Sequence, residues 1–74
     1  MARESEQKLL KAFGKRVADV RKSKGIKQQE LAEAVSMDVV SISYIENGNR
    51  WVRLSTLDKL AKALEVKRAD LLDF

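Results

Sequence analysis

The chain of 74 residues contains no cysteine, no histidine and no proline. Without cysteine it can form no disulfide, no thiolate metal site and no cysteine nucleophile. Without histidine it also lacks the commonest general base and zinc ligand. Since no convergent pair of carboxylates is evident either, we expect neither an enzyme nor a site for a metal, a cofactor or a small-molecule ligand.

Long apolar segments are absent as well. No stretch approaches the roughly 20 apolar residues that a membrane helix needs, and the N-terminus lacks the apolar core of a signal peptide. We therefore expect no membrane association and a cytoplasmic location. A single domain of this size buries only about 60% of its unfolded surface, so oligomerisation is a plausible source of further stability.

The net charge is +4, but it is unevenly distributed. Residues 8–27 contain eight lysine or arginine residues and one aspartate, a net charge of +7, whereas residues 1–7 carry −1, residues 28–53 carry −2 and residues 54–74 are neutral. Such a segment is either the solvated face of a helix or a surface that binds phosphates. The second interpretation predicts binding to nucleic acid.

Apolar residues recur at helical spacing along the chain, and no segment of strand length alternates with a period of two. We predict an all-α fold of five helices. The first three cover residues 5–24, 28–35 and 38–47. The fourth begins with a capping box at Ser55–Asp58, and the fifth is a last turn containing Leu71, Leu72 and Phe74. The apolar stripe of the first helix comprises Leu10, Phe13, Val17 and Val20. Asp38 is the expected N-cap of the third helix, and Gly25 and Gly48 are expected stops.

The third predicted helix has an apolar residue on each of two opposite faces. On a helical wheel Ile42 and Ile45 lie close together and define the inward face. Val40, Tyr44 and Asn47 fall on the opposite side, so a valine and a tyrosine point away from the core. Isolated apolar residues on a surface are common, but two on one short helix are also typical of a contact surface.

Two short helices joined by a turn of three to four residues form the pattern of a helix-turn-helix. Three segments, "FGKRVADVRKSKGIKQQELA" (13–32), "VSISYIENGNR" (40–50) and "TLDKLAKALEV" (56–66), resemble the lambdoid repressor and Cro-like DNA-binding domains of Xre type. The resemblance implies a five-helix fold whose third helix enters the major groove of double-stranded DNA. Residues 1–74 then form one domain, with residues 1–12 as an N-terminal extension of the first helix.

The resemblance also implies the DNA contacts. Gln28 matches a glutamine that contacts phosphate and braces the recognition helix. The base-facing positions hold Val39, Val40, Ser43 and Tyr44, and the positions on a loop against the DNA backbone hold Asn47, Asn49 and Arg50. We add Lys27, at the end of the basic segment. For Val39, partial burial is as plausible as a DNA contact.

Arg21 and Glu46 match an arginine–glutamate pair that ties the first helix to the third. The alternative is an ordinary surface pair, worth less than about 1 kcal/mol. Because the first turn of the recognition helix lacks Arg, Lys, Gln and Asn, direct hydrogen-bond readout is poor. Contacts of valine with thymine methyl groups, loop residues and DNA shape would then contribute to sequence preference.

The chain departs from the family pattern at three positions. Ser36 stands where glycine is usual, so a left-handed turn there would cost about 1 kcal/mol. Lys27 replaces a capping Ser or Thr before the second helix, and Arg53 replaces one before the fourth. These departures leave the fold intact but make its helix ends testable.

We expect a homodimeric, sequence-specific transcription regulator, because one short helix offers few base contacts. Val66, Leu72 and Phe74 are the candidate dimer interface, although Leu72 and Phe74 are equally placed to cover the core. The size and the "SYIENGNR" region also resemble the controller proteins of restriction–modification systems. An antitoxin, in which the same fold binds a toxin, is the alternative.

Overall fold

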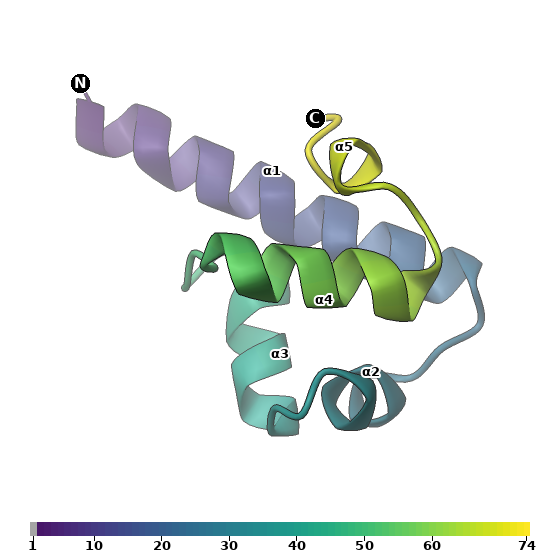
Figure 1. Ribbon diagram of the computed structural model, residues 1–74. Coiled ribbons are helices and arrows are strands. Elements are labelled where there is room, and N and C mark those ends of the chain that lie inside the picture. The colour runs from purple at the N-terminus through teal and green to yellow at the C-terminus, as the bar shows by residue number, and fades with distance from the viewer. Residues whose placement is uncertain (1) are drawn as a thin grey trace.

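The structure, a computed structural model, describes residues 2–74, and these residues contain five α-helices and no strand. The helices are α1 (Ala2–Ser23), α2 (Gln28–Ala34), α3 (Val39–Glu46), α4 (Leu54–Leu64) and α5 (Arg68–Leu71). The long helix α1 spans the molecule and its first turns project beyond the other helices (Figure 1). Helix α3 packs on α1 and α2, and α5 packs on α1 and α4. The predicted all-α fold of five helices is confirmed.

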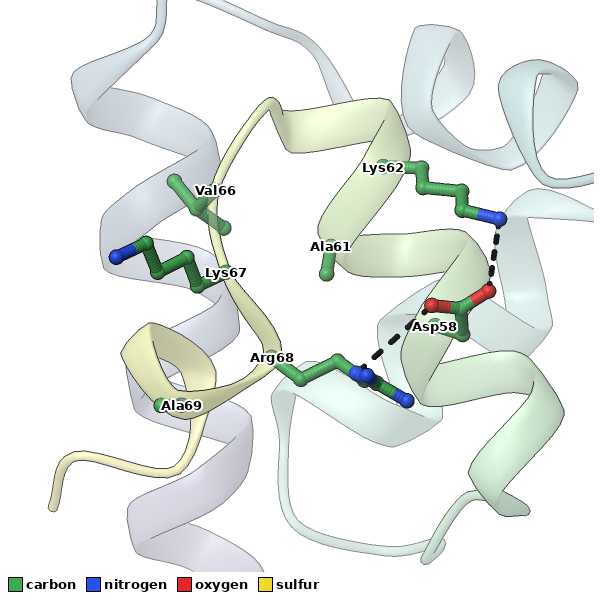
Figure 2. A pocket seen from close by; sticks show the side chains of 7 residues that line it. All are labelled: Asp58, Ala61, Lys62, Val66, Lys67, Arg68 and Ala69. Carbon is green, nitrogen blue, oxygen red and sulfur yellow. Dashed lines mark ion pairs between the residues drawn. The ribbon is translucent and has the colours of Figure 1, made fainter.

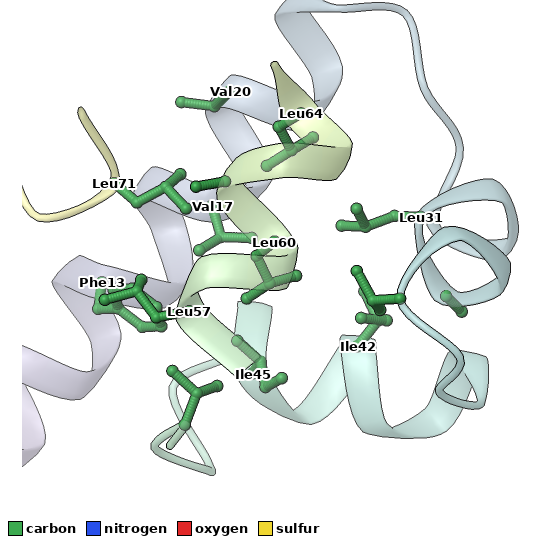
Figure 3. Packing of buried hydrophobic residues seen from close by; sticks show 14 residues of the cluster. Phe13, Val17, Val20, Leu31, Ile42, Ile45, Leu57, Leu60, Leu64 and Leu71 are labelled. Carbon is green, nitrogen blue, oxygen red and sulfur yellow. The ribbon is translucent and has the colours of Figure 1, made fainter. Parts of the chain in front are cut away.

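One apolar core joins all five helices (Figure 3). Its largest fully buried side chains are Phe13 and Val17 from α1, Leu31 from α2, Ile42 and Ile45 from α3, Leu60 and Leu64 from α4, and Leu71 from α5. Of the apolar stripe that the spacing predicts for α1, Phe13, Val17 and Val20 are buried in the core, whereas Leu10 is half-buried and lies outside it. The predicted helix over residues 5–24 was too short at its N-terminus, because α1 begins at Ala2 and not at Ser5.

The first four helices end in the same way. Each is followed by a residue with a positive φ angle, and the next N–H donates to the carbonyl oxygen five positions back, at 2.8 to 3.1 Å. The left-handed residues are Gly25, Ser36, Gly48 and Glu65. This arrangement is a Schellman motif, which satisfies carbonyl groups that a helix end would otherwise leave unpaired.

Two of these four stops are not glycine. Ser36 has φ 58°, so the left-handed turn whose cost the family pattern raised is present, and Glu65 has the same φ, which no sequence signal indicated. A side chain at this φ costs about 1–2 kcal/mol because Cβ approaches the following carbonyl oxygen. The residues after these stops, Met37 and Val66, pack against the core and so help to hold the turns in place.

Helices α2 and α5 both begin after a lysine that forms no side-chain cap. Instead, an acidic residue three positions further on accepts the N–H of the lysine at 2.9 Å, Glu30 for Lys27 and Asp70 for Lys67. This is one half of a capping box, and the carboxylate also suits the positive end of the helix dipole. At α3, Asp38 is the N-cap and its carboxylate accepts the N–H of Ser41 at 2.8 Å, as predicted.

The capping box predicted at Ser55–Asp58 is wrong. Helix α4 begins at Leu54 with Arg53 as its N-cap, and the N–H of Leu57 already donates to the carbonyl of Arg53 at 2.9 Å. The carboxylate of Asp58 does not turn back to the helix start. It lies 3.0 Å from Lys62 Nζ and 3.9 Å from Arg68 Nε, so these two cations take the place of the backbone N–H.

Candidate nucleic-acid interface

Helix α3 has one buried and one exposed face. Ile42 and Ile45 are fully buried in the core, where α3 packs on α1 and α2, whereas Val40 is 55% exposed and Tyr44 is 46% exposed. The wheel therefore predicted the orientation of both pairs correctly. Val39 is half-buried and packs against the edge of the core. An exposed apolar face on the second helix of a helix-turn-helix is suited to contacts with base edges and methyl groups.

A bidentate ion pair fixes this helix to α1. Arg21 donates from Nε to Glu46 Oε2 at 2.6 Å and from NH2 to Glu46 Oε1 at 3.0 Å. The NH1 group of Arg21 donates to the carbonyl of Ile26 at 2.7 Å. Only 8% of Arg21 and 5% of the Glu46 side chain are exposed, so the pair is a buried brace and not a surface ion pair. A buried pair survives because its remaining donors and acceptors are also satisfied.

Gln28 extends the brace to the start of α2. Its Nε2 donates to Glu46 Oε1 at 2.9 Å, so one carboxylate joins α1, α2 and α3. The neighbouring Lys27 is exposed at the N-cap of α2. The two residues therefore differ: Gln28 is tied to the recognition helix, and Lys27 extends a free cation from the same end of α2.

Asn47 is hydrogen-bonded within its own helix. Its Nδ2 donates to the carbonyl of Ser43 at 2.9 Å and to Ser43 Oγ at 3.2 Å. These bonds use the donors of the amide and leave its oxygen, with the Ser43 hydroxyl hydrogen, for an outside partner. Of the loop residues, Asn49 and Arg50 are exposed.

Arg50 lies over the exposed face of α3. Its NH1 donates to Ser41 Oγ at 3.3 Å, and its guanidinium carbon lies 5.5 Å from the centroid of the Tyr44 ring. The residues of the loop and the recognition helix thus form one surface. Ser41 was not predicted as part of this surface, because no local pattern relates it to Arg50.

Gly14 is a further position that the sequence analysis missed. It is buried in α1 where the end of α3 crosses, and a Cβ atom there would lie 2.7 Å from the carbonyl oxygen of Glu46 and even closer to that of Ile45. Glycine is therefore required for the close approach of the two helices. An isolated glycine within an apolar helical pattern was the available signal.

Part of the charge in residues 8–27 is neutralised within the molecule. Arg21 is paired with Glu46, and Lys15 Nζ lies 2.8 Å from the carboxylate of Asp19, the one acidic residue of the segment. The hydrogen bond from Lys15 holds the pKa of Asp19 below its ordinary value of 3.8. Arg16 donates to the carbonyl of Asp70 at 2.6 Å and so ties α1 to α5. Lys27 and the other exposed lysines remain as candidates for phosphate contacts.

The residues predicted to form the dimer interface differ in exposure. Leu72 and Phe74 are both exposed, while Val66 is half-buried and packs against the core. Phe74 also contacts the core, with its ring centroid 6.2 Å from that of Phe13. Val66 lines a groove between α4 and α5 (Figure 2), together with Asp58, Ala61, Lys62, Lys67, Arg68 and Ala69.

A shallow apolar hollow lies at the other side of the molecule, between the first half of α1 and the loop before α4. It is lined by Glu6, Leu9, Leu10 and Trp51. The Trp51 ring packs on Phe13 with a centroid separation of 4.8 Å, so the indole covers the edge of the core at this loop. Over residues 2–74 no helix has the length and apolarity to span a membrane. Among the side chains that the structure describes, those of residues 5–74, no three acidic groups gather as metal ligands.

Comparisons with known proteins agree on one fold. Residues 17–71 match the helix-turn-helix family HTH_3. The chain is 43% identical over 63 residues to the control protein C.BamHI of Bacillus amyloliquefaciens, an alignment that covers 84% of this chain and 78% of that protein. The α1 residues before Val17 lie outside the family match.

Two crystal structures superpose closely. The restriction-modification controller protein C.AhdI from Aeromonas hydrophila gives a TM-score of 0.81 at 35% identity, over 84% of this chain and 94% of that one. The clp gene regulator ClgR from C. glutamicum gives a TM-score of 0.84 at 33% identity, over 86% and 82%. The chain belongs to the Xre-type helix-turn-helix family, that of the lambdoid repressor and Cro-like DNA-binding proteins.

Proposed function

We propose that this helix-turn-helix transcription regulator binds a double-stranded DNA operator as a homodimer and controls a restriction–modification operon. The exposed face of α3, with Val40 and Tyr44 free of the core, is the observation that carries the DNA-binding part. The similarity to C.BamHI and C.AhdI supports the choice of operon. As a regulator of transcription the protein would act in the cytoplasm.

In this proposal the exposed residues of α3 enter the major groove and the loop and the start of α2 approach the backbone. Val39 and Val40 contact thymine methyl groups, and Ser43 and Tyr44 contact base edges. Lys27, Gln28 and Asn49 contact phosphates. The free amide oxygen of Asn47 accepts a hydrogen bond from a water that in turn donates to a phosphate. The brace between Arg21 and Glu46 sets the angle at which α3 is presented.

The dimer follows from the small number of base contacts in one protomer. Two recognition helices related by a twofold axis would contact half-sites about 10 bp apart, one turn along the groove. Leu72 and Phe74 are exposed apolar residues in a chain segment without net charge, and Val66 lies in the groove between α4 and α5. This interface leaves the basic segment free for DNA.

Selection of binding sites from a random DNA library tests the DNA-binding function. We expect a twofold-symmetric consensus and an affinity that falls with salt at a log–log slope of about −0.9 per neutralised phosphate. DNA upstream of a neighbouring restriction-enzyme gene should contain that consensus. Recovery of a consensus absent from any such region would contradict the operon assignment alone. A stable complex with the product of a neighbouring gene, without any DNA preference, would instead favour the antitoxin function.

Sedimentation of a double variant, Leu72→Glu with Phe74→Glu, tests the dimer. We expect a monomer that retains its helices by circular dichroism and loses cooperative binding to the operator. Leu54→Glu is the matched control, because Leu54 is an apolar residue that is 83% exposed outside the proposed interface. A wild-type protein that is monomeric at micromolar concentration and binds one protomer per operator would contradict the proposal.

A further inference from the structure

We infer that Arg50 is a specificity-determining residue that contacts a guanine base and that Tyr44 holds it in position for that contact. The inference rests on the proposed function, because it names the base that the same DNA-binding surface recognises. The family resemblance places Arg50 on the loop that touches the DNA backbone. The geometry points to a different role.

The guanidinium of Arg50 lies over the recognition helix. Arg50 follows α3 in sequence, yet its NH1 donates to Ser41 Oγ at 3.3 Å, in the first turn of that helix. The guanidinium also lies 5.5 Å from the Tyr44 ring centroid. Ser41 and Tyr44 are three positions apart and therefore neighbours on the helix surface. The Arg50 side chain thus folds back over the helix face that would enter the groove, where it contacts Ser41 and Tyr44.

Helix α3 itself has few side chains that can donate hydrogen bonds to a base. The helix sequence VVSISYIE contains no Arg, Lys, Asn or Gln, so it offers serine and tyrosine hydroxyls as its only side-chain donors. Among the side chains described on this surface, Arg50 supplies the guanidinium, a planar group with several N–H donors in a fixed geometry. Guanine presents two acceptors, O6 and N7, on its major-groove edge, and a bidentate arginine is the usual partner of that pair. An arginine placed on this face is therefore matched to guanine.

Tyr44 is the positioning residue. The Arg50 guanidinium lies over the Tyr44 ring at a cation–π distance, 5.5 Å from its centroid. A ring in this position attracts the positive charge without taking up the N–H groups as a carboxylate would, so donors remain for a base. The single bond to Ser41 Oγ occupies one NH1 hydrogen and leaves the others free. The ring therefore restricts the long side chain before DNA arrives, which reduces the entropy lost on binding.

The test begins with the full-length protein and the consensus selected by the wild type. We expect one guanine per bound protomer whose replacement by any other base is discriminated roughly 5- to 150-fold, the fold-change equivalent to a good bidentate contact. Arg50→Ala should abolish this preference at that position alone. Arg50→Lys should retain the salt dependence of binding but not the preference, since lysine keeps the charge and loses the planar guanidinium.

Modified bases identify the atoms. A 7-deazaguanine at the position removes N7 and should weaken binding of the wild type but not of Arg50→Ala. Inosine retains O6 and N7 and should be accepted by the wild type. Tyr44→Phe should preserve the preference, and Tyr44→Leu should reduce it about two- to fivefold, the fold-change expected for an exposed cation–π contact.

Arg53→Ala is the matched control, because Arg53 is an exposed arginine of the same loop and its loss changes the charge equally. It should leave every base preference unchanged. If Arg50→Ala weakened all sequences equally and Arg50→Lys restored wild-type binding, Arg50 would be a phosphate contact and the inference would be wrong. A wild-type protein that selects no consensus at all would overturn the proposed function as well.

Discussion

The two faces of α3 are built on different principles. The inward face is held by Ile42, Ile45 and the carboxylate of Glu46, all buried and all in contact with other helices. The outward face has Val40 and Tyr44, which are about half exposed and lie outside the apolar core. One set of residues therefore fixes the position of the recognition helix, and a separate set is available to DNA. Changes to one face should therefore affect stability, and changes to the other should affect binding.

The largest expected effect comes from breaking the brace. Glu46→Ala should lower the free energy of unfolding by about 3–5 kcal/mol, because it leaves Arg21 buried without a carboxylate and Gln28 without its acceptor. Urea denaturation measures the change. Asp58→Ala is the control, since Asp58 forms ion pairs at the surface and should cost less than about 1 kcal/mol. Equal losses in the two variants would mean that the brace is no stronger than a surface pair.

A smaller loss is expected when the two helices are forced apart. Gly14→Ala should destabilise the protein by about 1–3 kcal/mol, because the new methyl group overlaps the carbonyl groups at the end of α3. Its operator affinity should fall too, since α3 is displaced. Gly25→Ala is the comparison: nothing lies within 4 Å of a Cβ there, so about 1 kcal/mol from the left-handed φ is the whole expected cost. A thermally more stable Gly14→Ala protein would contradict the close contact.

Relieving the two strained stops should raise stability slightly. Ser36→Gly and Glu65→Gly should each stabilise the protein by up to about 1 kcal/mol, because glycine adopts their φ of 58° without a Cβ clash. Ser55→Gly, in the first turn of α4, serves as the control and should destabilise by a few tenths of a kcal/mol. Thermal melts distinguish the signs. Neither stop touches the outward face, so the operator sequence should not change.

The smallest effect on stability is expected on the outward face itself. Val40→Ala should change the free energy of unfolding by less than about 0.5 kcal/mol, because the side chain is largely in solvent. The same variant should bind the selected operator more weakly, which a fluorescence-anisotropy titration measures. Ile42→Val, on the opposite face, should cost about 0.5–1.5 kcal/mol and leave base preference intact. The reverse result would mean that the two faces are not independent.

The helices could be predicted from the sequence because their apolar period and their stops are local signals. Leu10, Phe13, Val17 and Val20 follow one period, and Gly25 marks the end of that helix. The errors lie at helix starts: Ser55 has the form of a cap, but α4 begins after Arg53 and Asp58 pairs with Lys62 instead of the helix start. A local sequence pattern does not indicate whether the carboxylate of Asp58 accepts a backbone N–H at the helix start or pairs with a nearby lysine.

The site was predicted less completely than the fold. The outward direction of Tyr44 follows from the wheel, whereas the pairing of Arg21 with Glu46 came only from the family resemblance. The requirement for Gly14 was not predicted, and neither was the contact of Arg50 with Ser41 and Tyr44. The ion pair, the close approach at Gly14 and the Arg50 contacts each join segments that are distant in sequence or depend on the path of a loop. The spacing of apolar residues within one helix therefore cannot predict them.

The placement of the single tryptophan and the single tyrosine has a practical consequence. Trp51 packs on Phe13 beside the first half of α1, while Tyr44 projects from the recognition helix beneath Arg50. The two chromophores therefore sample different parts of the molecule. Emission from the indole reports whether the loop is docked on α1, and the phenol signal reports what covers α3. Unfolding can thus be followed from selectively excited indole emission in an unlabelled sample. Light that excites the phenol also excites the indole, so the difference between the wild type and Tyr44→Phe isolates the phenol signal during operator binding.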